Sequence, residues 1–178
     1  MSFSVAQSIK TLLTPTAVDV AAATTDADAA QMRTTLEALV PLVLLRMIFN
    51  LHFKNKEGLR QMSRVAAGHS VSRHIAEMLN GNKRHQGILN MVPIVLGDEQ
   101  KAMARLLSGY GGLPEEKVQL LFRAFVPACL ELVGTEVKQR NMDTAAFESY
   151  LLQLRAEVQM LVPPSCLEAI NWKVPVQY

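Results

Sequence analysis

Hydrophobic residues recur along most of the chain at the three- and four-residue spacing of an α-helix. The most apolar stretch, LLFRAFVPACLELV at residues 120–133, has Pro127 in its middle. A second stretch, from Met32 to Met47, is also hydrophobic on nearly every side. Helices that are hydrophobic all round are buried. These two stretches are therefore predicted to form the centre of the protein.

The two central stretches also resemble each other. Three pairs of residues coincide when Pro41 is placed over Pro127: Ala38 with Ala124, Val40 with Val126 and Leu44 with Leu130. Proline lacks an amide hydrogen and clashes with the preceding helical turn, so each central helix is expected to kink or to divide at its proline. The similarity predicts two related helical units, at about residues 10–68 and 98–162.

Shorter helices are predicted around these two centres. Asp26 is expected to begin the first long helix, and Gly109 is expected to end a helix that starts near residue 98. Connections are expected at residues 80–87, an exposed loop rich in Asn and Gly, and again from Gly134 to Asn141. We therefore predict an all-α bundle of about eight helices, folded as a single domain over residues 1–165.

The end of the chain follows another pattern. Five apolar residues alternate with other residues there, which is the period of an extended strand: Ile170, Trp172, Val174, Val176 and Tyr178. We predict an extended tail over residues 166–178. The tail either lies along a groove of its own chain or binds a protein partner, by adding a strand or by placing its tryptophan in a pocket.

Composition supports an all-helical fold in one domain. The chain has 178 residues, of which 49% are hydrophobic and only 6% aromatic, and it is rich in Leu, Ala and Met, which favour helices. Two cysteines cannot form a disulfide framework, which indicates a reducing compartment. The first residues lack the pattern of a secretory signal. The longest apolar run, Ala38–Leu51, contains Arg46 and is shorter than the roughly 20 residues that span a bilayer. These observations predict a cytoplasmic protein without a transmembrane segment.

Basic residues are concentrated in the middle of the chain. The net charge is +2, but residues 46–85 carry a charge of about +6 from eight lysines and arginines and two glutamates. The basic residues of this window are Arg46, Lys54, Lys56, Arg60, Arg64, Arg73, Lys83 and Arg84. A solvated helical face is the ordinary explanation of such a run. The functional alternative is contact with an anionic partner such as a nucleic acid through Arg73, Lys83 and Arg84.

No histidine pattern in the sequence indicates a metal site. His69 and His74 are five residues apart, whereas a metal-binding pair on one helix face is four apart. His52 and His85 have no carboxylate or cysteine nearby at ligand spacing. We therefore predict no metal and no cofactor.

The sequence also gives only weak indications of catalytic residues. Cys129 lies in an apolar helix, where burial makes a thiol a poor nucleophile. The glycine-rich turn at residues 109–112 lacks the Lys-Ser or Lys-Thr that follows a phosphate-binding loop. Glu115 and Glu116 are adjacent and point to different sides of a helix, so they cannot act as a facing acid–base pair. The sequence therefore predicts a protein that is not an enzyme.

The arrangement of the aliphatic, small and proline residues resembles the YidB-like family of small bacterial proteins. The matching residues of the first unit are Leu12, Leu13, Pro15, Val18, Ala21, Ala22, Val40, Pro41, Glu57, Gly58 and Leu59. Those of the second unit are Leu106, Leu107, Gly112, Val126, Pro127 and Gly134. The family is a domain of unknown function, found alone or fused to a peptidoglycan-binding domain. The resemblance implies an all-helical fold and supplies no catalytic residues.

These observations together favour a non-enzymatic bacterial interaction module. Such a scaffold or adaptor would associate with itself or bind a protein partner, with the tail as the contact. Nucleic-acid binding by the basic segment, residues 46–85, is the alternative.

Overall fold

The computed structural model describes residues 4–53 and 56–170, and within these ranges every regular element is a helix. The α-helices are α1 (Val5–Leu12), α2 (Pro15–Thr25), α3 (Ala29–Phe53), α4 (Lys56–His69), α5 (Ile75–Leu79), α6 (Gln86–Leu89), α7 (Met91–Leu96), α8 (Gln100–Gly111), α9 (Glu115–Gln139), α10 (Thr144–Leu161) and α11 (Pro164–Ala169). The short 3₁₀ helices are η1 (Val71–Arg73), η2 (Lys83–His85) and η3 (Gly97–Glu99). The prediction of an all-α bundle is confirmed, but the described residues form eleven α-helices where about eight are predicted.

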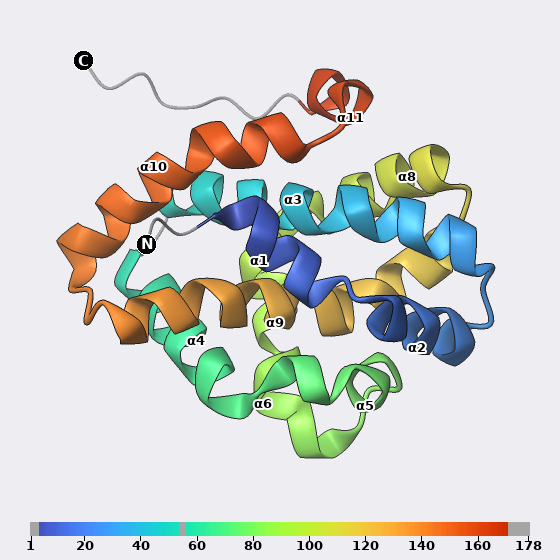
Figure 1. Cartoon of the computed structure of the whole chain (residues 1–178), viewed down its shortest axis with the longest axis horizontal. Helices are drawn as coiled ribbons and strands as arrows, with labels where there is room; N and C mark the ends of the chain where they lie inside the picture. The colour runs from blue at the N-terminus through green and yellow to red at the C-terminus, as the bar shows by residue number, and fades with distance from the viewer. Residues whose placement is uncertain (1–3, 54–55, 171–178) are drawn as a thin grey trace.

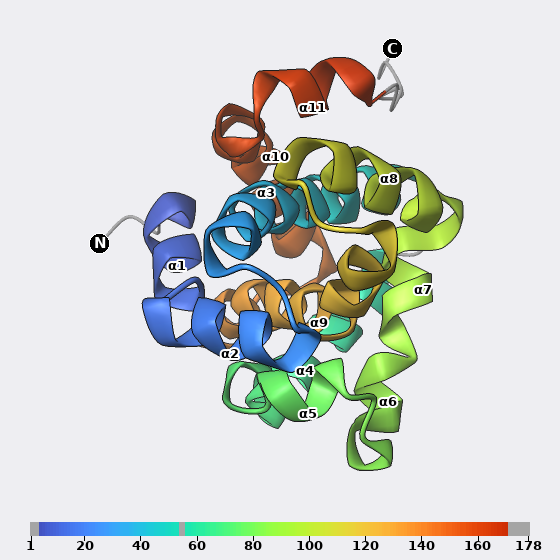
Figure 2. The same ribbon diagram turned by 90° about the vertical axis from the view of Figure 1, so that its right-hand side faces the viewer.

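Helices α3 and α9 run side by side through the middle of the bundle, and the other helices lie around them (Figure 1). In this view α8 and α10 lie above the pair and α4, α5 and α6 lie below it. Turning the molecule shows α1 and α2 on one side and α7 on the other (Figure 2). This arrangement buries both long helices, as their sequences predict.

Burial of the two central helices is nearly complete. On α3 the side chains of Leu36, Leu39 and Val43 have no exposed area, and on α9 the same holds for Phe122 and Phe125. The two helices meet where the Cys129 thiol lies 3.8 Å from the backbone oxygen of Val40. Among the described helices, α9 is long and apolar enough to cross a membrane, but most of that length is buried inside the protein.

Neither proline divides its helix. Pro41 and Pro127 are buried inside α3 and α9, and both helices continue through them over 25 residues. Each proline deprives the carbonyl four residues earlier of its usual amide donor. Of the two expected outcomes, a kink or a division, division into shorter helices does not occur, because dense packing on all sides offsets the loss of one hydrogen bond per helix.

The ends of the helices differ from the expected ones at three positions. Asp28, and not Asp26, caps α3, since its carboxylate accepts a hydrogen bond of 2.9 Å from the amide of Gln31, while Asp26 ends α2 in the left-handed conformation. Helix α8 continues through Gly109 and ends at Gly112. Helix α9 continues through Gly134 instead of ending there.

Gly134 lies inside α9 because α4 crosses it at very short range. A Cβ atom added to this glycine would lie 1.8 Å from the backbone oxygen of Ser63 and 3.1 Å from the Cβ of Ala67. Ser63 turns its hydroxyl back to the carbonyl of Leu59 at 2.7 Å, which leaves the crossing free of unsatisfied polar atoms. The small residues therefore allow two helix backbones to touch.

A second contact joins the beginnings of α4 and α10. The carboxylate of Glu57 accepts hydrogen bonds from Nε and Nη2 of Arg60 at 2.9 and 2.6 Å, and one from the hydroxyl of Thr144. Arg60 also donates to the backbone oxygen of Met142 at 3.0 Å. The hydrogen bonds from Arg60, followed by those from Thr144 and Gln61, lower the pKa of Glu57 to about 2.

The first residues of the predicted tail are part of helix α11. The tail was expected from residue 166, but Pro164–Ala169 is helical and buries Cys166. An extended backbone is present at Ile170, the C-cap of this helix. The other four alternating residues, Trp172, Val174, Val176 and Tyr178, lie outside the described residues.

Substitution of Gly134 by Ala should destabilise the fold. The added methyl group has to push α4 and α9 apart, and such overpacking costs about 1–3 kcal/mol. The matched control is Gly109→Ala in α8, where an added Cβ would meet no other atom within 4 Å. This control should gain about 1 kcal/mol from helix propensity. Urea denaturation measures both, and equal stability of Gly134→Ala and wild type would contradict the close crossing.

The stability contributed by Glu57 should depend on pH. Since folding lowers its pKa from the ordinary 4.5 to about 2, the carboxylate stabilises the fold fully above pH 4.5, and this contribution is lost as the pH falls through 2. We expect Glu57→Gln to be less stable than wild type at neutral pH, and the difference to shrink as the pH falls from 4.5 to 2.

Urea denaturation at several pH values checks this expectation. Glu37→Gln is the control, because it removes an exposed carboxylate from a surface pair with Arg33 whose charged atoms are 3.7 Å apart. Such a surface change should alter stability by at most about 0.5 kcal/mol. A pH-independent difference between Glu57→Gln and wild type would contradict the role given to the carboxylate.

Candidate functional site

The segment between α4 and α8 contributes to two groups of polar side chains that lie close together in space. It consists of short helices, from η1 to η3, that pack against one side of α9 (Figure 1). The sequence predicts an exposed loop here at residues 80–87, but in the structure this stretch contains η2 and the start of α6. The segment forms two features, a hollow and a histidine cluster.

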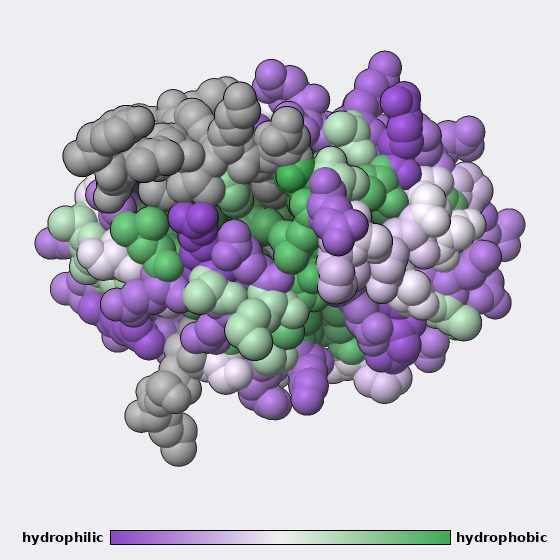
Figure 3. Space-filling model, turned by 90° about the horizontal axis from the view of Figure 1, so that it is seen from above, coloured by the Kyte–Doolittle hydropathy of each residue, from purple (hydrophilic) through white to green (hydrophobic). Residues whose placement is uncertain are grey.

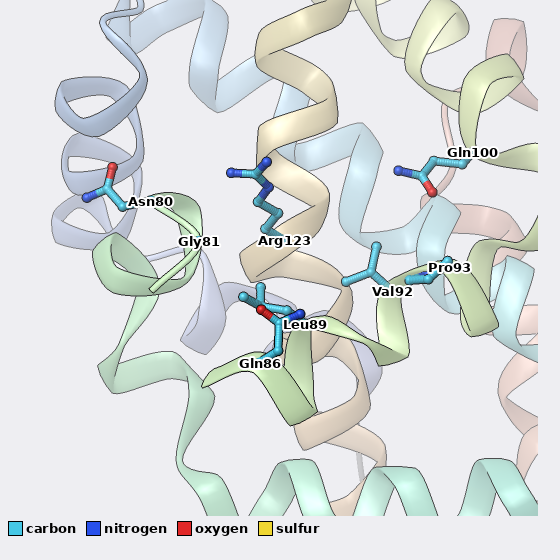
Figure 4. Close-up of a pocket in the computed structure, with 8 residues that line it drawn as sticks. All are labelled: Asn80, Gly81, Gln86, Leu89, Val92, Pro93, Gln100 and Arg123. Carbon is cyan, nitrogen blue, oxygen red and sulfur yellow. The ribbon is translucent and has the colours of Figure 1, made fainter. Parts of the chain in front are cut away.

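A hollow of about 540 Å³ lies between this segment and α9. Its lining residues are Asn80, Gly81, Gln86, Leu89, Val92, Pro93, Gln100 and Arg123 (Figure 4). Three of them carry side-chain amides, and Leu89, Val92 and Pro93 are apolar. The lining therefore combines hydrogen-bonding groups with apolar surface.

Arg123 is the charged group of the hollow. Its side chain rises from α9 between the Asn80–Gly81 turn on one side and Gln100 on the other (Figure 4). One guanidinium nitrogen donates to the backbone oxygen of Leu79 at 3.3 Å, which leaves other donors of the fork for a ligand. Gly81 has φ of 67° and faces this guanidinium, so a side chain there would be strained and would crowd Arg123.

Neighbouring amides fix the walls of the hollow. Gln86 donates to the side-chain oxygen of Asn90 at 2.7 Å, and Gln100 donates to that of Gln119 at 3.0 Å. These contacts hold two lining side chains in place while each keeps a carbonyl oxygen and further N–H groups. The hollow is therefore suited to a ligand that has both hydrogen-bonding groups and a negative charge.

Three histidines meet where the end of α4 lies against the same segment. The ring centroids of His74 and His85 are 5.0 Å apart, as are those of His69 and His85. Nε2 of His69 lies 2.7 Å from Nδ1 of His85, and Nε2 of His85 lies 2.5 Å from a carboxylate oxygen of Glu77. His85 is only 3% exposed. The expectation that residues 80–87 form an exposed loop is therefore wrong at His85.

The electrostatics of the cluster follow from this geometry. The pKa of Glu77 is lowered, first by its hydrogen bond with His85. The pKa of His69 is lowered, first by burial and then by the nearby charges of His85, His74 and Arg84. Glu131 of α9 fastens the neighbouring turn, since its carboxylate accepts hydrogen bonds from the amide and hydroxyl of Ser72 at 3.0 and 3.1 Å.

The basic residues predicted to contact an anion lie beside this cluster. Arg73, Lys83 and Arg84 are exposed on η1 and η2. Other basic residues of the window are engaged within the protein: Arg46 donates to the backbone oxygen of Leu96 at 3.2 Å, and Lys56 pairs with Glu148. The local positive field is consequently smaller than the count of charges in the sequence indicates.

Of the five alternating residues predicted to bind a partner, Ile170 is the one whose position is described. It is half-buried and lines a hollow of about 280 Å³ between α8 and α11, together with Ala102, Met103 and Leu106. Seen from above, apolar surface is visible among hydrophilic residues (Figure 3). Leu152 and Met160 on α10 are 40% and 87% exposed. The chain before the tail thus ends next to apolar surface.

The candidate catalytic residues of the sequence are not brought together. Cys129 is fully buried, and burial raises the pKa of its thiol. Glu115 lies at the start of α9 and pairs with Arg105 at 3.5 Å on the surface.

The hollow and the histidine cluster were both missed by reasoning from the sequence. The hollow has no local signal, because its residues come from four helices and from the Asn80–Gly81 turn. The cluster has one signal that could have been used: His74 and Glu77 are three residues apart, which places them on one face of a helix. The approach of His85 to this pair depends on the fold of residues 78–84 and could not be read from spacing.

Comparison with known proteins finds no family model that matches the chain, and it finds no match among curated proteins or solved structures. The resemblance to the YidB-like family therefore stays a prediction.

Proposed function

We propose that the protein is a non-enzymatic interaction module that binds an acidic peptide segment of a protein partner in the hollow around Arg123. The observation that carries this proposal is the position of one arginine among three amide side chains and three apolar ones (Figure 4). Amide side chains pair with the backbone of a peptide, and the apolar lining accepts a hydrophobic side chain. The guanidinium pairs with a carboxylate, which it can bind through two parallel hydrogen bonds.

The charge of the surroundings supports an acidic ligand. Lys83 and Arg84 are exposed on η2, directly after the Asn80–Gly81 turn that lines the hollow. Positive charge near a binding site raises the rate at which an anionic partner associates. Binding of an acidic ligand would therefore account both for the basic segment, residues 46–85, and for the arginine in the hollow.

We also propose that the fold, and with it the hollow, is built from two related helical units. Two observations support it beyond the similarity around the prolines. The helix after each long helix packs on the other long helix, since α4 crosses α9 and α10 packs on α3. The helix before each long helix also lies against both of them. The units differ at the crossing, because Ile48 occupies the position that the overlay pairs with Gly134.

Selection from a random peptide library on the immobilised protein tests the binding proposal. We expect enrichment of peptides that combine an Asp or Glu with a hydrophobic residue. Arg123→Gln should weaken their binding by about tenfold or more, because it removes a charge-assisted hydrogen bond. Arg123→Lys keeps the charge but not the fork of donors and should bind with an intermediate affinity.

The control for this experiment is Arg33→Gln. Arg33 lies at the start of α3 and pairs only weakly with Glu37 on the surface, so its substitution changes the net charge equally and should leave the affinity unchanged. Absence of enriched peptides, or equal affinity for wild type and Arg123→Gln, would contradict the proposal.

We propose that the tail is a second binding surface, through which copies of this chain associate with each other. The support is its alternating apolar sequence and its start beside the hollow between α8 and α11. Exposed Leu152 and Met160 extend the apolar surface along α10. Nucleic-acid binding by Arg73, Lys83 and Arg84 is less well supported, since several other basic residues of the window are already engaged in contacts within the protein.

Removal of residues 171–178 should reduce self-association without loss of helix. The truncated chain keeps α11 and Ile170, so the packing of Cys166 is preserved. We expect sedimentation equilibrium to give a lower average mass for the truncated chain than for the full chain, with the same circular dichroism. An unchanged mass would contradict self-association, whereas a large fall in melting temperature would show that the tail belongs to the core of its own chain.

A further inference from the structure

The cluster of His74, Glu77 and His85 is not used by the proposed peptide site. Each of these residues presents one ligand atom, and the three atoms lie within 4.8 Å of one another. A carboxylate oxygen of Glu77 is at their centre, 2.5 Å from Nε2 of His85 and 3.9 Å from Nδ1 of His74. We propose that His74, Glu77 and His85 bind a divalent transition-metal ion of the zinc class.

The donor set selects the kind of ion. Two imidazoles and one carboxylate are ligands that zinc accepts in proteins, whereas calcium and magnesium prefer sites made of oxygen atoms alone. Three protein ligands leave a fourth tetrahedral position open for water. Both cysteines are buried elsewhere and do not compete for the ion.

The distances need only small side-chain movements. Around a zinc ion with bonds of about 2.1 Å, tetrahedral ligand atoms are about 3.4 Å apart. The contact between Glu77 and His85 therefore has to open by roughly an ångström, and the His74 ring has to move closer. The side chains of His74 and Glu77 are 34% and 40% exposed, so both can rotate and the ion can enter from solvent.

His85 is the fixed part of the site, because it is buried and held from behind by His69. The carboxylate of Glu77 can only accept, so Nε2 of His85 carries the hydrogen in the ion-free protein, and in that tautomer Nδ1 of His85 accepts from Nε2–H of His69. When Nε2 of His85 binds the metal, its proton has to move to Nδ1, which then donates to Nε2 of His69. The proton of His69 moves to its own Nδ1, so neither ring gains or loses a proton. A metal ligand whose second nitrogen is hydrogen-bonded in this way has a fixed ring orientation.

Isothermal titration of the full chain with zinc chloride tests the site. We expect one zinc ion per chain and at least tenfold weaker binding in His74→Gln and in Glu77→Gln. The control is Glu131→Gln, which removes a negative charge near the same cluster without removing a ligand, and its affinity should stay within twofold of wild type. Magnesium should not compete. Absence of zinc binding, or equal weakening by Glu131→Gln and Glu77→Gln, would overturn the proposal.

A second measurement on the wild-type chain does not depend on any variant folding. Nitrogen-15 NMR of the histidine rings distinguishes Nδ1–H from Nε2–H tautomers. We expect zinc to convert His85 from the Nε2–H to the Nδ1–H tautomer. A bound zinc ion that leaves the ring signals of His74 and His85 unchanged would show that the ion binds elsewhere, and would overturn the proposal.

Discussion

The fold depends on the need to cover two helices that are apolar on nearly every side. An amphipathic helix needs a partner on one face only, but α3 and α9 expose hydrophobic surface in all directions and require several partners each. The chain has no sheet in the described residues to supply a broad cover, so short helices from before, between and after the two long ones provide it. The bundle is therefore arranged around a pair and not around a single central helix.

Direct contact of backbones at Gly134 is the second constraint. At this glycine the backbones of α4 and α9 are in direct van der Waals contact, which increases the dispersion attraction between the two helices. It also fixes the direction in which α4 leaves the core. Helix α4 ends at His69, so the crossing determines where the segment with the hollow and the histidine cluster begins. The position of both candidate sites thus follows from a contact that has no polar function.

Reasoning from sequence succeeded where the cause was local and failed where it was distant. The burial of α3 and α9 could be predicted, because it follows from the periodicity of their own residues. Glycine commonly ends a helix, and the sequence predicts this role for Gly134. Its actual role depends on Ser63, 71 residues earlier. His85 was read as part of a loop for the same reason, since its burial depends on contacts with His69 and Glu77.

The packing of α10 on α3 has a consequence for the order in which the protein can fold during synthesis. Helix α3 leaves the ribosome early, whereas α10 begins at residue 144, close to the end of the described chain. The face of α3 that packs on α10 therefore stays uncovered by that helix until about 90 more residues have been made. During that part of synthesis, a hydrophobic surface of the nascent chain lacks the partner that covers it in the folded protein.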